Sequence, residues 1–487
     1  MEVEHACRSG ATRHAGIWAG DESLTHQEFD GTFARACPAH DSVTFPPADF
    51  PPDGIVAITT FNEALEVLRS AHVKQGAGTR TPIVTVDYHG HIVSGPGHET
   101  HGDLDTAEWE EFFRRGSLAR VEGDEHNKRR RPVNPLFSRD AHLWFRDNVL
   151  APTLIDVRRQ IAELRDSDGI ARMELVNFAM RIFVQVTAKL VGFDRLNDAE
   201  MAQRLVDLSA VIETGRRGGA EGPITDAVRT AMEAAMAART SLMQEYYLPS
   251  LARRKALVEA ARNDANAALP HDYLTLVARG IVPHEDELGG PHAGLIGAIQ
   301  HLQGSTGTNT DVLVNSVAQL DEWFALHTED RALRTDPKFL AAALHEALRL
   351  RGAGSYALSR VALRDITLST GRVIHEGQYV AILNDDVNRD TSVFGPDAAE
   401  FNPRRVVPTG TYEFGLAFGS GTHMCIGLPL VLGQGGLTGL QVPVLQVLFE
   451  EGISRDPTGE PQFFAEMLPF RHRYKRFPVL FSGKTDA

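Results

Sequence analysis

Apolar residues recur every three to four positions over most of the chain, a spacing that predicts amphipathic helices. The clearest example is residues 173–193, MELVNFAMRIFVQVTAKLVGF. Further helical patterns cover residues 61–71, 107–116, 126–137, 150–166, 229–265 and 292–326. Residues 361–384 instead alternate in short segments around Gly-containing turns, which predicts hairpin strands. The pattern as a whole predicts a mainly α protein with a small β portion.

The domain organisation follows from where this pattern begins. Residues 1–45 are polar and weakly patterned, and we interpret them as an N-terminal extension. A proline-rich stretch, FPPADFPPDG, then leads into a short strand-like run at residues 54–60. No internal repeat or clear linker follows, so residues 46–487 are predicted to form one large unit.

Composition and charge narrow the class of protein. The chain has 487 residues, 43% of them hydrophobic and 23% charged, which is ordinary for a folded protein. A net charge of −15 argues against nucleic acid as a partner. Three cysteines give no disulfide framework, and no apolar segment resembles a signal peptide, so we expect a cytoplasmic protein.

One stretch is long and apolar enough to raise the question of a membrane anchor. Residues 426–449 contain no charged residue, but prolines, glycines and glutamines interrupt them. We therefore predict a buried helix and its continuation there, with no membrane anchor.

Cys425 lies in an unusual glycine-rich turn within LAFGSGTHMCIGLPL, residues 416–430. A free cysteine is most often an inert, buried side chain. That interpretation does not explain Gly419, Gly421 and Gly427, which indicate a tight turn whose backbone passes close to a flat group. The apolar run that follows predicts a helix N-terminus, which favours the thiolate form of a cysteine. A single cysteine thiolate is one of the recognised axial ligands of haem iron.

Residues 418–427 resemble the haem-binding signature of the cytochrome P450 family, F-G-x-G-x-H-x-C-x-G, at every specified position. The resemblance implies the cytochrome P450 fold, one large helix-rich unit that encloses haem b (iron protoporphyrin IX). It also implies that Cys425 is the axial ligand of the haem iron. The other cofactor-binding residues that it assigns to this turn are Phe418, Gly419, His423 and Gly427.

A glutamate and an arginine in the segment HEALR form a second motif of the same family. Glu346 and Arg349 lie three residues apart, on one face of a predicted helix. Such a pair is commonly an ordinary surface ion pair. The resemblance implies instead a buried structural pair, held by an arginine from a later loop, for which Arg405 in FNPRR is our choice.

Basic residues elsewhere in the chain match the family's contacts to the haem propionates. His126 and Arg130 lie one helical turn apart, and Arg360 follows the HEALR helix. The resemblance assigns these three residues and His423 to the propionates, which suits the affinity of guanidinium groups for carboxylates. A basic cluster is more often a solvated face. Here its other members could also contact an electron-donor protein: Lys128, Arg129 and Arg131.

The long helix at residues 292–326 departs from the family pattern A/G-G-x-D/E-T, whose acid and alcohol help to deliver protons to oxygen. Alignment on Gly304 places neither an acid nor an alcohol at the key positions. Alignment on Gly307 keeps the alcohol as Thr310 and puts Asn309 in the place of the acid. We prefer the second alignment, because Thr310 then lies 36 residues before Glu346, close to the family's usual spacing. An amide does not shuttle protons as a carboxylate does. A bulge in the helix is the alternative explanation of this small-residue window.

The resemblance implies a haem-thiolate monooxygenase that inserts one oxygen atom of O2 into an apolar or aromatic small molecule, in secondary metabolism. A separate ferredoxin-type donor is expected to supply electrons. Because Asn309 replaces the acid, a peroxide-using peroxygenase or a non-oxygenating isomerase or dehydratase is the alternative. A haem protein that only binds partners is the third hypothesis.

Overall fold

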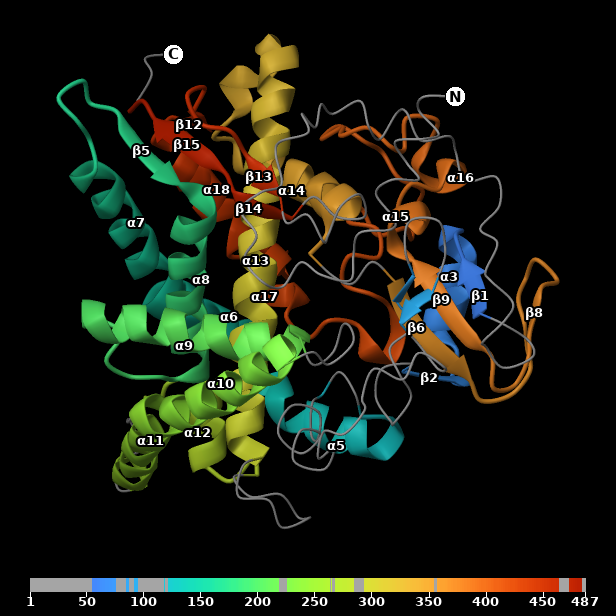
Figure 1. Ribbon diagram of the computed structural model, residues 1–487, viewed down its shortest axis with the longest axis horizontal. Coiled ribbons are helices and arrows are strands. Elements are labelled where there is room, and N and C mark those ends of the chain that lie inside the picture. Colours follow the sequence, from blue (N-terminus) through green and yellow to red (C-terminus); the bar gives the residue numbers. More distant parts are fainter. Residues whose placement is uncertain are drawn as a thin grey trace.

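A long central helix, α13 (Ala293–Leu326), forms the spine of the computed structural model (Figure 1). The structure describes residues 55–75, 85–86, 92–94, 118, 121–218, 226–262, 264, 268–283, 293–353, 357–463 and 473–483. The predicted N-terminal extension and the predicted helix at residues 107–116 lie outside these ranges. Parts of the unit predicted for residues 46–487 also lie outside the described ranges.

Helices account for most of the described chain, as the apolar spacing predicts. The α-helices are α3 (Phe61–Arg69), α5 (Gly123–Val133), α6 (Arg139–Phe145), α7 (Ala151–Glu163), α8 (Leu175–Val191), α9 (Ala199–Gly218), α10 (Asp226–Leu242), α11 (Leu248–Ala261), α12 (Tyr273–Ala278), α13, α14 (Pro337–Arg351), α15 (Asn384–Val387), α16 (Thr391–Phe394), α17 (Leu428–Leu432) and α18 (Gln441–Glu450). Short 3₁₀ or π segments are η2 (Asn134–Phe137), η3 (Arg146–Leu150), η4 (Met243–Tyr247), η5 (Thr328–Leu333) and η6 (Gly421–His423).

The β portion is divided between the two sides of the molecule, and at one of them β1, β9, β6 and β2 form a four-stranded sheet (Figure 1). β1 runs parallel to β9 and the other neighbours are antiparallel. A three-stranded sheet has the order β12-β15-β5, and the other strands form hairpins. The bounds are β1 (Ile55–Ile58), β2 (Val73–Gln75), β3 (Thr85–Val86), β4 (Ile92–Ser94), β5 (Ala171–Glu174), β6 (Ala357–Ala362), β7 (Ile366–Thr367), β8 (Val373–Ile374), β9 (Tyr379–Leu383), β10 (Gly433–Gln434), β11 (Leu437–Thr438), β12 (Ile453–Arg455), β13 (Gln462–Phe463), β14 (Tyr474–Arg476) and β15 (Pro478–Phe481).

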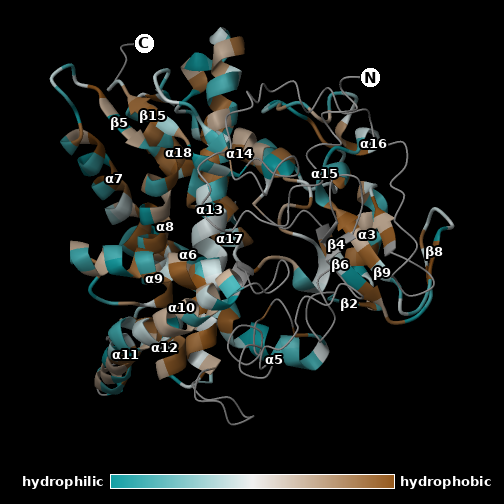
Figure 2. Ribbon diagram, in the orientation of Figure 1, coloured by the Kyte–Doolittle hydropathy of each residue, from teal (hydrophilic) through white to brown (hydrophobic). Residues whose placement is uncertain are grey.

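The largest hydrophobic core joins α7, α8, the second half of α13, α14 and α18. Helix α8 shows why the sequence folds this way locally. Its first N–H groups are capped by the Glu174 carboxylate, and it ends at Gly192, which has a φ of 101°. Figure 2 shows α8 and α18 rich in hydrophobic residues, whereas the middle of α13 is pale because Gly, Ser and Thr residues occupy it.

The predicted helix over residues 426–449 is wrong. Helix α17 ends at Leu432, the β10–β11 hairpin follows, and α18 begins only at Gln441. The hairpin turns at Gly435 and Gly436, whose φ values of 55° and 81° favour glycine. These glycines, which would weaken a helix, therefore form a tight turn. In the part of the chain that the structure describes, no helix is long and apolar enough to cross a membrane.

Candidate functional site

The cysteine turn connects η6 to α17 and is held by its own backbone. The Cys425 N–H donates to the Phe418 carbonyl (2.9 Å), and Gly419 and Gly421 have φ values of 66° and 72°. A Cβ atom on Gly421 would lie 2.3 Å from the carbonyl oxygen of Leu68 in α3. The turn therefore requires glycine both for its conformation and for its approach to α3.

The thiol of Cys425 lies within the fold and yet keeps accessible surface. Burial raises its pKa, whereas the N–H groups of Gly427 and Leu428 and the charge of Arg130 act to lower it. We expected the helix N-terminus to lower the pKa; the N–H groups do so, but burial outweighs them. The cysteine is nevertheless exposed in the structure. A thiol that keeps accessible surface can bond to a metal, and the bond to the metal removes its proton.

His126 of α5 is buried, with 1% of its surface exposed, and neither ring nitrogen has a hydrogen-bond partner among the described residues. Its ring packs against that of His423, with centroids 4.3 Å apart and an angle of 50° between the ring planes. Burial, together with the charges of His423 and Arg130, lowers the pKa of His126 to about 4. Unpaired buried nitrogens are rare, and these two are the donors or acceptors that a bound polar group would use.

Arg360 of β6 is also buried, and its guanidinium donates to Gln75 Oε1 (2.6 Å) and to the carbonyl of Ser359 (2.8 Å). Burial lowers its pKa to about 10, against the opposing effect of the Glu122 charge. Glu122 Oε2 lies 3.0 Å from His423 Nε2. The sequence interpretation missed Glu122 and Gln75. The one available signal for Glu122 was its position four residues before His126, at the start of a helix.

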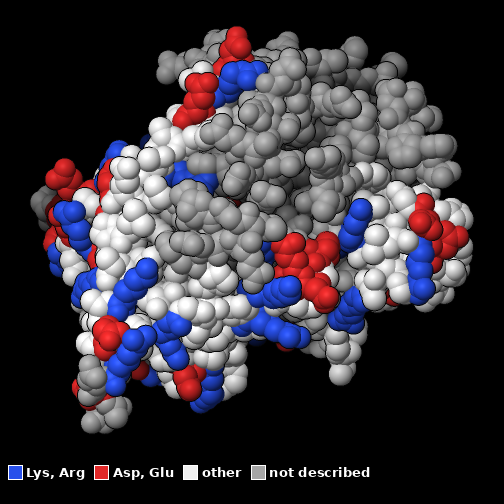
Figure 3. Space-filling model, turned by 90° about the horizontal axis from the view of Figure 1, so that it is seen from below, with Lys and Arg blue, Asp and Glu red and all other residues white. Residues whose placement is uncertain are grey.

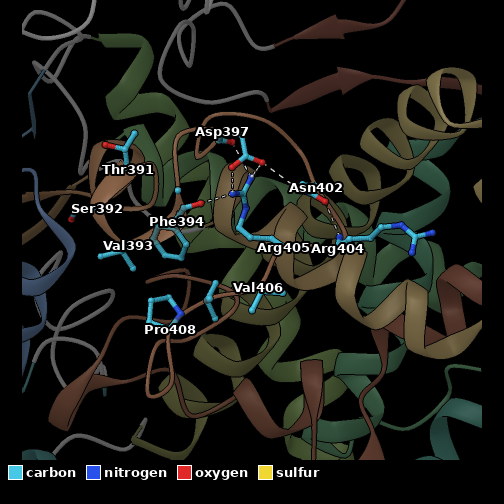
Figure 4. A pocket seen from close by; sticks show the side chains of 12 residues that line it. Thr391, Ser392, Val393, Phe394, Asp397, Asn402, Arg404, Arg405, Val406 and Pro408 are labelled. Carbon is cyan, nitrogen blue, oxygen red and sulfur yellow. Dashed lines mark hydrogen bonds and ion pairs between the residues drawn. The ribbon is translucent and has the colours of Figure 1, made fainter.

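The second motif is a buried ion cluster. Arg349 donates twice to the Glu346 carboxylate, at 2.6 and 2.7 Å, and Arg405 Nε donates to the same carboxylate at 2.9 Å. Arg405 also pairs with Asp397 at 2.8 Å, as Figure 4 shows. The three residues chosen from the sequence therefore lie together. A cavity of about 490 Å³ lies against this cluster, and none of its lining residues belongs to the cysteine turn.

Asn388 connects the ion cluster to the cysteine turn and was also missed. Arg349 Nη1 donates to the Asn388 carbonyl, and Asn388 Oδ1 accepts from the N–H of Leu416 at 2.8 Å. A Cβ atom on Gly415 would lie 2.3 Å from Asn388 Oδ1. The cluster thus fixes the start of the turn that carries Cys425.

Thr310 and Asn309 lie side by side in α13 but have different partners. The Thr310 hydroxyl donates within the helix to the Thr306 carbonyl (2.9 Å). The Asn309 amide donates to the carbonyl and hydroxyl oxygens of Ser305, and Asn309 Oδ1 accepts from Gln441 Nε2 of α18 at 2.8 Å. The amide is therefore engaged between two helices, a contact that the sequence did not reveal.

The residues fit haem. Cys425 offers a thiol with free surface, His126 offers two unpaired ring nitrogens, and Arg130 lies close enough to Cys425 for their charges to interact. Phe418 packs edge-on against Phe414, with ring centroids 5.3 Å apart. The described part of the chain contains no cluster of three or more His, Cys, Asp or Glu residues that could hold a metal ion by itself.

Comparisons with known proteins agree with this arrangement. A profile of the family described as "Cytochrome P450" matches residues 329–432. The chain is 32% identical over 148 residues to indoleacetaldoxime dehydratase of Arabidopsis thaliana, which is 29% of each chain. It is 25% identical over 370 residues to C-19 steroid 1alpha-hydroxylase of Sorangium cellulosum, or 75% of this chain and 82% of the relative. The match thus spans less than a third of the first relative and most of the second.

The fold is similar to that of CYP109E1 from Bacillus megaterium, solved in complex with corticosterone. The TM-score is 0.58, the sequence identity 17%, and the alignment covers 88% of this chain and 93% of that structure. At this identity the likeness concerns the fold.

Proposed function

We propose that this chain, which belongs to the cytochrome P450 family, is a haem-thiolate monooxygenase. Members of this family use haem b. The observation that carries the proposal is the environment of Cys425, a thiol that keeps accessible surface and lies close enough to the half-buried Arg130 for their charges to interact. Haem ligated by a thiolate supplies oxygen activation, in which one atom of O2 enters the substrate and the other leaves as water.

The chain's own residues would hold the cofactor from both ends. The Cys425 sulfur would bond to the iron, and the N–H groups of Gly427 and Leu428 would stabilise its negative charge. His126, Arg130 and Arg360 would bind the propionates. The buried, unpaired ring nitrogens of His126 would gain a carboxylate partner there, and the two guanidinium groups would supply positive charge. Thr310 donates its hydroxyl proton to the Thr306 carbonyl, and it would have to leave this hydrogen bond to act as the proton-delivering alcohol.

The substrate that we propose is an apolar or aromatic small molecule, with O2 as co-substrate and electrons from a ferredoxin-type donor. The relatives support the substrate class, since one is named a steroid hydroxylase and one structure was solved with corticosterone. The basic end of α5 offers a contact for an acidic donor. Figure 3 views the molecule from the side of α5, where basic and acidic side chains are interspersed.

The test is spectroscopic and needs no substrate. The purified protein with haem, reduced and exposed to carbon monoxide, should give the long-wavelength Soret band of thiolate ligation. Cys425→Ser should lack this band. A wild-type protein that binds no haem, or binds it without this band, would refute the proposal.

A second candidate function is a haem-thiolate reaction without oxygen activation or with peroxide as oxidant. The amide at position 309 favours it, because an amide has no ionisable proton to deliver, and both its nitrogen and its oxygen are hydrogen-bonded within the protein. The Arabidopsis relative is named a dehydratase, which also supports this candidate. Turnover with reduced ferredoxin and O2 supports the monooxygenase, whereas turnover only with peroxide, or with neither oxidant, supports the second candidate.

A further inference from the structure

Glu122 occupies the N-cap position of α5, but its side chain makes no capping hydrogen bond. The carboxylate instead reaches two other segments of the chain. Oε2 pairs with His423 Nε2 of η6 at 3.0 Å, and Oε1 accepts from the backbone N–H of Gln75 at the end of β2. One carboxylate therefore joins three elements: α5, β2 and η6.

The surroundings of this carboxylate are basic. Gln75 is opposite Arg360 in the β2–β6 pairing, and its side chain accepts a hydrogen bond from the Arg360 guanidinium. Burial alone would raise the pKa of Glu122, but the hydrogen bonds from His423 and Gln75 and the charges of His423 and Arg360 lower it overall. Glu122 is thus an anion among the residues that we assign to the haem propionates.

Two consequences follow for the neighbouring histidines. Because His423 Nε2 is paired with Glu122, the His423 ring is held in the position in which it packs, tilted, against His126. The backbone of Glu122 also accepts the His126 N–H at 3.2 Å, which sets the first turn of α5. Among the residues that the structure describes, the two ring nitrogens of His126 remain without hydrogen-bond partners.

We propose that Glu122 is a positioning residue of the haem site, which clamps His423 and Gln75 so that the basic groups are arranged for the haem carboxylates. This inference rests on the proposed haem-binding function. The clamp acts through His423, and through Gln75 on Arg360. Without the carboxylate, three chain segments lose their shared contact, and each basic group gains freedom that haem binding must then remove.

The experiment measures haem retention rather than turnover. Holoprotein variants would be mixed with excess apomyoglobin, and the rate of haem transfer followed in the Soret region. Glu122→Ala should lose haem roughly 10-fold to 100-fold faster than the wild type, the range for residues that orient a ligand. Glu122→Asp should restore part of the retention, because it keeps the charge. Glu122→Gln, which keeps the shape but not the charge, should fall between the alanine variant and the wild type.

Glu125→Ala is the matched control, since Glu125 lies on the same helix and forms an exposed ion pair with Arg129, four residues later. It should lose haem within about twofold of the wild-type rate, as expected for an exposed pair. Equal rates for the Glu122 and Glu125 variants would overturn the proposal. Slower haem loss from Glu122→Gln would also overturn it, because Glu122 would then compete with a propionate.

If Glu122→Ala does not fold, as judged by circular dichroism, the nearly isosteric Glu122→Gln variant decides. The wild-type spectrum distinguishes a failure of the proposed haem-thiolate function from a failure of the proposed role of Glu122. A wild-type protein that lacks the thiolate signature refutes the proposed function, whereas a normal signature with unchanged retention in the variants refutes only the role of Glu122.

Discussion

The amide of Asn309 offers the sharpest test of how α13 is built. Asn309→Asp preserves the shape of the side chain and exchanges Nδ2 for an oxygen. In the structure Nδ2 donates to the Ser305 carbonyl at 2.8 Å, and Asn309 is only 4% exposed. The new oxygen would face a carbonyl oxygen, so only a protonated aspartic acid can reproduce this hydrogen bond.

The expected cost has two parts. Loss of the donor to a buried carbonyl costs about 1–3 kcal/mol. Ionisation adds to this cost, because burial and the facing carbonyl would raise the pKa of the introduced acid above its unfolded value of about 3.9. A folded pKa two pH units higher than the unfolded one adds about 2.7 kcal/mol at neutral pH.

The sign of the pH dependence follows from proton binding. The folded variant would hold its proton more tightly than the unfolded chain, so low pH favours folding. Relative to the wild type, the variant should therefore be least destabilised below about pH 4. The deficit should grow as the pH rises toward the folded pKa and then stay constant.

The assay is urea unfolding of wild type and variant at several pH values between 5 and 8. Asn148→Asp is the control, since the Asn148 amide also donates to a carbonyl four residues earlier, that of Trp144, but on an exposed face. Its deficit should be small and nearly independent of pH. If Asn309→Asp loses no more stability at pH 8 than at pH 5, the site accommodates a carboxylate, and our reasoning about the buried amide is wrong.

Three further predictions concern the ion cluster, the turn and the alcohol. Glu346→Gln removes the charge that Arg349 and Arg405 share and, among the described residues, leaves only Arg405 with a second carboxylate, that of Asp397. It should lower the free energy of unfolding by about 3–5 kcal/mol; a loss below 1 kcal/mol in urea titrations would contradict this estimate. Gly415→Ala should destabilise the protein by more than Gly436→Ala, because only the first substitution adds a clash with Asn388 to the strain of a positive φ, and equal melting temperatures would refute the argument. Thr310→Ala should increase the peroxide released per electron consumed, and an unchanged ratio would count against Thr310 as the proton-delivering alcohol.

Motifs that are contiguous in the sequence, or lie one helical turn apart, could be predicted. The cysteine turn is a single run of residues, and its glycines report directly on backbone conformation. Glu346 and Arg349 lie three residues apart on one helix, so their contact follows from helix geometry. Their burial and their contact to Arg405 came only from the resemblance, because the sequence does not distinguish a buried ion pair from an exposed one.

Contacts between distant segments could not be predicted. Glu122 meets His423 across 301 residues, and its partner Gln75 lies in a strand that is only three residues long. The prediction of one helix after Cys425 was wrong for a different reason. A long uncharged run is compatible with one buried helix, and the glycines were interpreted as a weakness of that helix rather than as a turn.

Two features depart from the family pattern: Asn309 in the place of the acid, and the uncharged, glycine-rich segment after Cys425. The two meet in one contact. After α17 the hairpin brings the chain back, so that the N–H of Leu440 donates to the Leu430 carbonyl at 2.8 Å. A Cβ atom on Gly439 would lie 2.2 Å from the Val431 carbonyl, so this return requires glycine. Gln441 then begins α18 with no exposed surface and donates to both oxygens of Asn309. A buried glutamine needs a polar partner, and the amide at position 309 supplies one where a carboxylate would bring a buried charge. The hairpin and the missing acid are therefore one structural solution, which joins α13 to the segment that follows the cysteine turn.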